Sequence, residues 1–166
     1  MRCYIHTIGC QMNVYDSEQI LAHLSTLGYR PVEDPEAADL IVLNTCAIRQ
    51  KAEQKVYSFL GRQAKRKKSR PDLILAVGGC VAQQEGEDLL HRLPQLDLVF
   101  GTHAVGRLAH HVDQILKNGG PIVDVRMDDP PVSFEKAPAS LDQHGPARFV
   151  TIMQGCDNFC TYCVVP

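Results

Sequence analysis

The chain has 166 residues, of which 45% are hydrophobic and 22% charged, and its formal net charge is −2 at pH 7. These are the values of an ordinary globular protein that is long enough for one domain with its own core. No apolar run is long enough to span a bilayer, and the first residues lack the apolar stretch of a secretory signal. We therefore expect a cytoplasmic protein without a membrane partner, and the net charge gives no indication of nucleic-acid binding.

Apolar runs alternate with helical segments along most of the chain. Leu40-Ile41-Val42-Leu43, for example, is typical of a strand buried on both faces of a sheet. The expected strands span residues 3–8, 40–43, 73–77, 98–100 and 122–125, with a short, weak strand at 29–32. The expected helices span residues 17–27, 49–67, 84–92 and 105–117, the first with Asp16 as its N-cap. This alternation predicts a parallel sheet with right-handed crossovers.

The fold prediction is therefore an α/β domain over residues 1–125, flavodoxin-like, with three α/β/α layers and a five-stranded parallel sheet. Beyond it, prolines and glycines such as Pro130-Pro131 and Gly145-Pro146 interrupt any periodicity, which predicts a linker at 126–147. Residues 148–153 again have the pattern of a strand. We expect residues 148–166 to be the truncated start of a second domain.

The C-terminal segment contains three cysteines within eight residues. Cys156, Cys160 and Cys163 are separated by three and two residues, so one short loop can place three thiolates around one metal centre. Thiolates are the usual ligands of iron–sulfur clusters, and three cysteines on a four-iron cube leave one iron open. Zinc is the alternative, but zinc loops favour a second cysteine pair or histidines, and none follows here. The pattern fits a [4Fe-4S] cluster, and zinc stays open as the alternative.

Three further cysteines, Cys10, Cys46 and Cys80, each follow a predicted strand. The carboxyl ends of parallel strands meet at one edge of a sheet, where open α/β sheets build their binding sites. Strands about 4.8 Å apart would bring the three thiols within reach of one cluster. The alternative is that they are small core residues, since free cysteine is often simply buried. Cys3 lies inside the first strand, and we assign it to the core.

Other polar features carry weaker indications. Asn13 and Asn44 lie close to two of these cysteines, and they either tune a metal site through hydrogen bonds or simply suit a turn. The basic run at residues 65–68 is explained by the solvated C-terminal end of a helix. His110 and His111 are expected on a helix surface, and neither is assigned as a ligand.

Four motifs resemble a known family. In chain order they are Thr7-Ile8-Gly9-Cys10-Gln11-Met12-Asn13, Leu43-Asn44-Thr45-Cys46-Ala47-Ile48-Arg49, Gly78-Gly79-Cys80 with Gln83, and the loop from Cys156 to Cys163. Together they resemble the methylthiotransferases, which are radical S-adenosylmethionine (SAM) enzymes with an extra N-terminal domain. The residues around Cys10 resemble the MiaB-type, tRNA-modifying branch more than the branch that modifies a ribosomal protein.

The resemblance implies two [4Fe-4S] clusters and SAM as cofactors. The ligands of the SAM-binding cluster would be Cys156, Cys160 and Cys163, with Tyr162 as a candidate SAM contact. The ligands of an auxiliary cluster, which carries the sulfur to be inserted, would be Cys10, Cys46 and Cys80.

The activity implied is the insertion of a methylthio group at C2 of N6-isopentenyladenosine, next to the anticodon of a tRNA. An electron donor and a sulfur source would be further partners. Residues 148–166 would begin a radical-SAM barrel, and this chain alone is expected to be inactive without the rest of it. Two other functions remain open: membership of the ribosomal-protein branch, and a non-catalytic module whose cysteines hold zinc or a small cluster.

Overall fold

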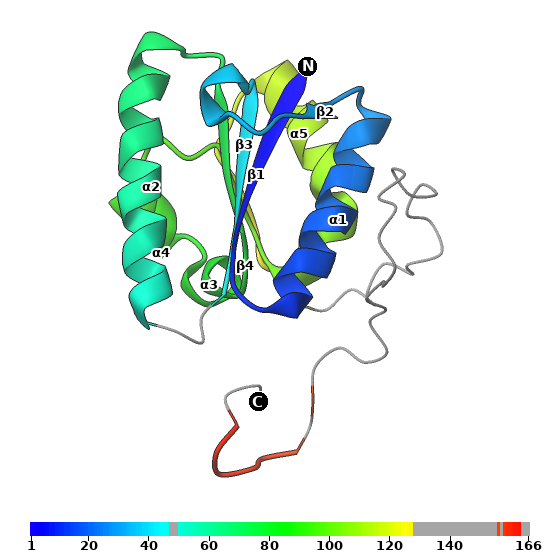
Figure 1. Cartoon of the computed structure of the whole chain (residues 1–166), viewed down its shortest axis with the longest axis vertical. Helices are drawn as coiled ribbons and strands as arrows, with labels where there is room; N and C mark the ends of the chain where they lie inside the picture. Colours follow the sequence, from blue (N-terminus) through cyan, green and yellow to red (C-terminus); the bar gives the residue numbers. More distant parts are fainter. Residues whose placement is uncertain (47–49, 128–155, 157, 164–166) are drawn as a thin grey trace.

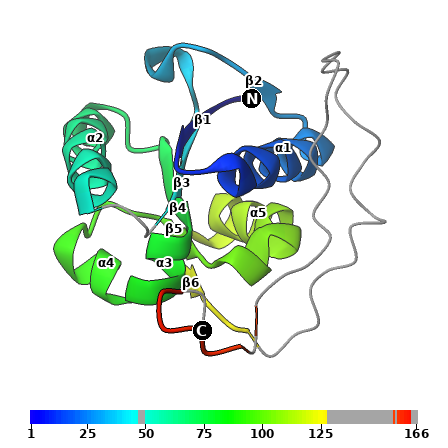
Figure 2. The same cartoon turned by 60° about the horizontal axis from the view of Figure 1, so that its bottom comes forward.

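The structure, a computed structural model, describes residues 1–46, 50–127, 156 and 158–163, and the side chains of residues 50–55 are not among what it describes. Most of these residues form three layers, with a parallel sheet between two layers of helices (Figures 1 and 2). The α/β prediction is therefore confirmed. Most of the expected linker and the expected strand at 148–153 lie outside the described residues.

The sheet has six parallel strands in the order β2-β1-β3-β4-β5-β6. The strands are β1 (Arg2–Ile8), β2 (Arg30–Pro31), β3 (Leu40–Thr45), β4 (Ile74–Gly79), β5 (Leu98–Phe100) and β6 (Ile122–Asp124). The first five follow the flavodoxin-like order that we predicted. The predicted number of five strands is wrong, because the weak strand β2 does pair with β1, at Arg2 and Cys3, while β6 extends the sheet beyond β5.

Two hydrophobic cores hold the layers together, one on each face of the sheet. Alternate residues of β3 serve them in turn: Leu40 and Val42 face α1 and α5, whereas Ile41 and Leu43 face α2 and α4. All six residues of β3 are buried, as expected of a central strand covered on both faces. Cys3 is 0% exposed within the first core, and burial raises the pKa of its thiol to about 11, so its assignment to the core is confirmed.

The helices are α1 (Gln11–Thr26), α2 (Gln50–Ser69), α3 (Cys80–Glu85), α4 (Asp88–Arg92) and α5 (Leu108–Asn118), with 3-10 turns η1 (Pro35–Ala37) and η2 (Thr102–Arg107). Two predicted helices differ clearly from the structure. Asp16 is not an N-cap but lies inside α1, which begins six residues earlier with Cys10 as its N-cap. The single helix expected at 84–92 is two short helices, interrupted at Gly86, whose φ is +51°.

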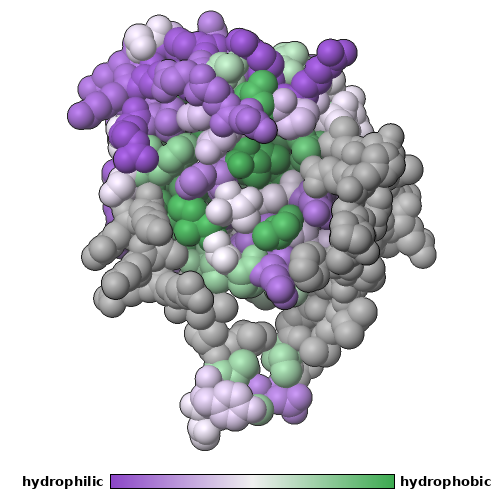
Figure 3. All heavy atoms as spheres, in the orientation of Figure 1, coloured by the Kyte–Doolittle hydropathy of each residue, from purple (hydrophilic) through white to green (hydrophobic). Residues whose placement is uncertain are grey.

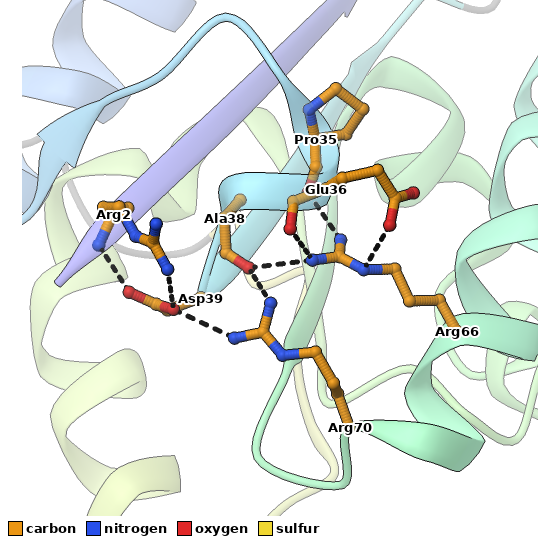
Figure 4. A network of polar contacts seen from close by, with 7 residues as sticks. All are labelled: Arg2, Pro35, Glu36, Ala38, Asp39, Arg66 and Arg70. Carbon is orange, nitrogen blue, oxygen red and sulfur yellow. Dashed lines mark hydrogen bonds and ion pairs between the residues drawn. The ribbon is translucent and has the colours of Figure 1, made fainter.

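A network of polar contacts fixes the amino edge of the sheet (Figure 4). Arg66 of α2 donates to the carbonyls of Pro35 and Glu36 and forms an ion pair of 3.0 Å with the Glu36 carboxylate. Arg70 donates to Asp39 at 3.0 Å. Burial alone would raise the pKa of Asp39, but hydrogen bonds from Arg2 and Arg70 outweigh burial and lower it.

The basic run of α2 is therefore only partly solvated. The side chains of Arg66 and Lys67 are 10% and 16% exposed, and Lys67 pairs with Asp97, so our interpretation of the run as a solvated helix end is wrong for these two residues. Figure 3 shows hydrophilic side chains gathered over this end of the molecule. These charges lie at the edge opposite to the one where the strands end.

A second buried polar network lies at the C-terminal end of β6. Asp124 is 3% exposed and accepts hydrogen bonds from Arg107 at 2.7 and 2.9 Å. Its other partners are Arg126 and, at 2.7 Å, His111 Nε2. Burial alone would raise the pKa of Asp124, but these partners hold it far below its usual range. His111 is 7% exposed, so its predicted surface position is wrong. No helix in the described part of the chain is both long and apolar enough to cross a membrane.

Candidate metal centre at the carboxyl edge of the sheet

Three cysteines lie at one edge of the sheet, just past the carboxyl ends of three neighbouring strands. Ile8, Thr45 and Gly79 are partners in register across β1, β3 and β4. Cys46 and Cys80 directly follow two of these partners, and Cys10 follows Ile8 by two residues. Since neighbouring strands lie about 4.8 Å apart, the topology brings together residues that are 34 or more positions apart in the sequence.

The three thiols differ in exposure. Cys10 is exposed, Cys80 is partly exposed and Cys46 is buried, with 5% of its surface accessible. Cys10 precedes the first turn of α1, and Cys80 is the first residue of α3. Across residues 1–46, 50–127, 156 and 158–163, no three Cys, His, Asp or Glu side chains are gathered tightly enough to hold a single metal ion.

Two glycines allow the loops at this edge to approach each other. A Cβ atom at Gly9 would lie 2.8 Å from the Cβ of Cys46, so the backbone beside Cys10 packs directly against Cys46. A Cβ atom at Gly79 would lie 2.3 Å from the carbonyl oxygen of Thr45. Gly79 also has φ +90° and ψ −160°, a conformation almost restricted to glycine. These contacts hold the three cysteine-bearing loops close together.

Gln83 is a further residue of this edge whose role the sequence did not reveal. Its Nε2 donates to the carbonyl of Val125 at 2.7 Å, and its side chain passes over Gly101, where a Cβ would lie 1.9 Å from its Oε1. The helix that starts at Cys80 is thereby tied to the end of β6. In the sequence, Gln83 stood out only as part of the third motif. Its hydrogen-bond partner lies 42 residues away, so no local pattern reveals the contact.

The C-terminal cysteines form a separate local arrangement. The Cys163 N–H donates to the Cys160 carbonyl at 3.0 Å, which closes a turn and brings these two residues near each other. Asn158 Nδ2 lies 3.5 Å from Cys156 Sγ. Cys160 and Cys163 are exposed, and Tyr162 is 91% exposed. All seven cysteines of the chain are among the described residues, and none forms a disulfide.

The chain therefore has a flavodoxin-like α/β domain with three cysteines at the carboxyl edge of its sheet. Sheets of this kind bind their ligands at that edge. Comparison with known proteins gives the family. Residues 2–101 match the family described as "Uncharacterized protein family UPF0004", and the chain belongs to this family.

The chain is also similar to curated proteins named tRNA-2-methylthio-N(6)-dimethylallyladenosine synthase. It is 56% identical to that of Desulfosudis oleivorans over 99% of this chain and 35% of the relative. It is 50% identical to that of Geobacter sulfurreducens and 46% identical to that of Dichelobacter nodosus, each over 98% of this chain and 36% of the relative. The chain thus spans about a third of the length of the curated relatives it matches.

Proposed function

We propose that this chain is the N-terminal, cluster-binding part of a radical-SAM tRNA methylthiotransferase, and that Cys10, Cys46 and Cys80 hold its auxiliary [4Fe-4S] cluster. The observation that carries the proposal is the position of these three cysteines at the carboxyl ends of three adjacent strands. Three unrelated core residues would have no reason to share one edge.

The donor set fits a four-iron cluster, because thiolates are the usual ligands of such clusters. A four-iron cube accepts its ligands at separate corners, so it suits thiols on separate loops. When bound, such a cluster would supply the sulfur-carrying site of the reaction. The protein would hold three irons through thiolates and leave the fourth free.

We further propose that Cys156, Cys160 and Cys163 hold the SAM-binding cluster. The turn between Cys160 and Cys163 supports this assignment, because its backbone hydrogen bond brings these two residues near each other. Tyr162 is exposed beside them and is a candidate contact for SAM. Residues 1–125 would form the auxiliary-cluster domain, 126–147 a linker, and 148–166 the start of the radical-SAM domain.

The names of the relatives favour a tRNA substrate that carries N6-isopentenyladenosine, modified at C2. They favour this substrate over the ribosomal protein that the sequence left open. An electron donor and a sulfur source complete the proposed partners, and the cytoplasm, where tRNA is modified, is the proposed location. The activity itself belongs to the whole protein.

The test is anaerobic reconstitution with iron and sulfide, followed by iron counting and spectroscopy. We expect about eight irons per chain in the wild type, because two four-iron clusters are proposed. Replacement of Cys10, Cys46 and Cys80 together by alanine should remove about four of them. The same replacement of Cys156, Cys160 and Cys163 should remove the other four, and Cys3→Ala, in the core near the amino edge, should remove none. Wild-type iron content in the first triple variant would refute the auxiliary site.

A further inference from the structure

We infer that a buried hydrogen-bond network centred on Asn13 and Asn44 positions the three strand-edge cysteines before any cluster arrives. The inference rests on the proposed function, because it assigns these residues a role toward the auxiliary site. Asn13 is 2% exposed, Asn44 is 1% exposed and Thr45 is fully buried. They come from the first turn of α1 and the end of β3, directly beneath the cysteine loops.

One line of hydrogen bonds connects all three loops. The Cys10 N–H donates to Asn13 Oδ1 at 3.2 Å. Asn13 Nδ2 then donates to the carbonyl of Thr45, the residue before Cys46, at 3.1 Å. The Thr45 hydroxyl in turn donates to the carbonyl of Gly78, two residues before Cys80, at 2.7 Å. Three bonds therefore span the whole candidate site.

A second set of bonds fixes the two asparagines against each other. Asn13 Nδ2 donates to Asn44 Oδ1 at 3.2 Å, and Asn44 Nδ2 donates back to the Asn13 carbonyl at 2.9 Å. Asn44 Nδ2 also donates to Ser17 Oγ at 3.0 Å, which exchanges a 2.8 Å bond with the Thr7 hydroxyl. Each side-chain amide thus uses both of its N–H groups.

Stability alone does not explain such a network. A typical buried hydrogen bond contributes only about 1 kcal/mol net, and apolar residues of the same shape can replace a buried polar pair at little cost. A fully satisfied polar network instead makes one arrangement rigid and unique. Here the arrangement that it fixes is the relative position of the Cys10, Cys46 and Cys80 backbones. Residues that orient metal ligands in this way typically change metal affinity 10–100-fold when they are replaced.

The experiment uses this chain with Cys156, Cys160 and Cys163 replaced by alanine, so that any iron bound reports the strand-edge site. In this parent we would compare Asn13→Ala, Asn44→Ala and the double variant, with Asn118→Ala at the exposed end of α5 as a control. The measurements are the rate of iron loss to a chelator, the electron paramagnetic resonance spectrum of the reduced cluster, and thermal unfolding of the metal-free chain.

We expect each single variant to lose iron about 10–100-fold faster than the parent at a temperature where all variants are folded. The double variant should lose iron only slightly faster than either single variant, since both residues act in one network. The resonance spectrum should broaden, a change that a loss of stability alone would not produce. The control should match the parent.

Two results separate the possible failures. A parent that binds no iron would overturn the proposed function, and this inference with it. A parent that holds iron, with asparagine variants that lose it within twofold of the parent's rate, would overturn the inference alone. Should the asparagine variants not fold, Thr45→Val decides, because it removes only the hydroxyl bond to Gly78. Unchanged iron loss and an unchanged spectrum in Thr45→Val would then overturn the inference.

Discussion

Replacing Gly79 by alanine tests the close packing of the cysteine loops most directly. The residue has φ +90° and ψ −160°, which costs a side-chain-bearing residue about 1–3 kcal/mol. The added Cβ would also lie 2.3 Å from the Thr45 carbonyl oxygen and 2.7 Å from Asn44 Oδ1. The Thr45 carbonyl is held in place by Asn13 Nδ2 at 3.1 Å. Overpacking at such a site adds about 1–3 kcal/mol, so we expect Gly79→Ala to lower the free energy of unfolding by about 4 kcal/mol.

Substitutions at two other glycines distinguish the backbone strain from the steric overlap of the added Cβ. Gly119 has φ +81° and ψ 172°, a closely similar backbone conformation, but no described atom lies within 4 Å of its added Cβ. Gly119→Ala should therefore show the backbone cost alone, about 2 kcal/mol. Gly61 lies inside α2 with equally open surroundings. Gly61→Ala should stabilise the chain by about 0.5–1 kcal/mol, because alanine is the better helix former.

The assay is urea unfolding of the reduced, metal-free chain, followed by circular dichroism. The expected loss is a large fraction of the ~5–15 kcal/mol by which domains are usually stable. If the losses in unfolding free energy of Gly79→Ala and Gly119→Ala differ by less than about 1 kcal/mol, the difference is close to the experimental error. That result would contradict the rigid contact with Thr45. The loops at the cysteine edge would then be able to move apart.

Two further predictions concern charged groups. Burial raises the pKa of Asp16 to about 6, above its ordinary value of 3.8, so ionisation destabilises the folded chain increasingly as pH rises from about 4 to about 6. Asp16→Asn should therefore stabilise the chain by about 1–2 kcal/mol at pH 8 and by less at pH 5, as measured by thermal unfolding at both values; a gain that is larger at pH 5 would contradict the burial effect. Arg66→Ala should cost about 2 kcal/mol in urea unfolding, because it leaves the Pro35 and Glu36 carbonyls without their charged donor. Lys65→Ala, at an exposed neighbouring position, should stay within about 0.5 kcal/mol of the wild type. Equal effects of the two substitutions would show that the hydrogen bonds of Arg66 to these carbonyls add no stability.

Much of the fold could be predicted because the strands are strongly patterned. β5 was predicted with its true bounds at 98–100, and β3 was found from its continuous apolar run, although its last residues, Asn44 and Thr45, were missed. Those two are polar and fully buried, and only their partners from other loops make that possible. The start of α1 was missed for a similar reason. Cysteine is not among the preferred N-cap residues, whereas Asp16 is such a residue and lies inside the helix.

The candidate site was predictable at the level of topology and not at the level of contacts. Cysteines that follow strands must share an edge in a parallel sheet, whatever the details of packing. The partnership between Asn13 and Asn44 joins positions 31 residues apart, and no local pattern encodes it. The same is true of Arg66, whose sequence context suggested a solvated helix end but whose partners are carbonyls of a distant turn.

The parallel sheet also gives the domain two chemically different ends. β1 starts next to Met1 and runs for seven residues to the cysteine edge, a length of about 23 Å at 3.3 Å per residue. A fluorophore or affinity tag attached at Met1 would therefore sit beside the arginine network and leave the three thiols uncovered. β6 ends at the carboxyl edge of the sheet, so a label placed at Arg126 would lie on the same side as the three cysteines. The choice of labelled position thus decides whether a probe lies close to the candidate site or at the far end of the strands.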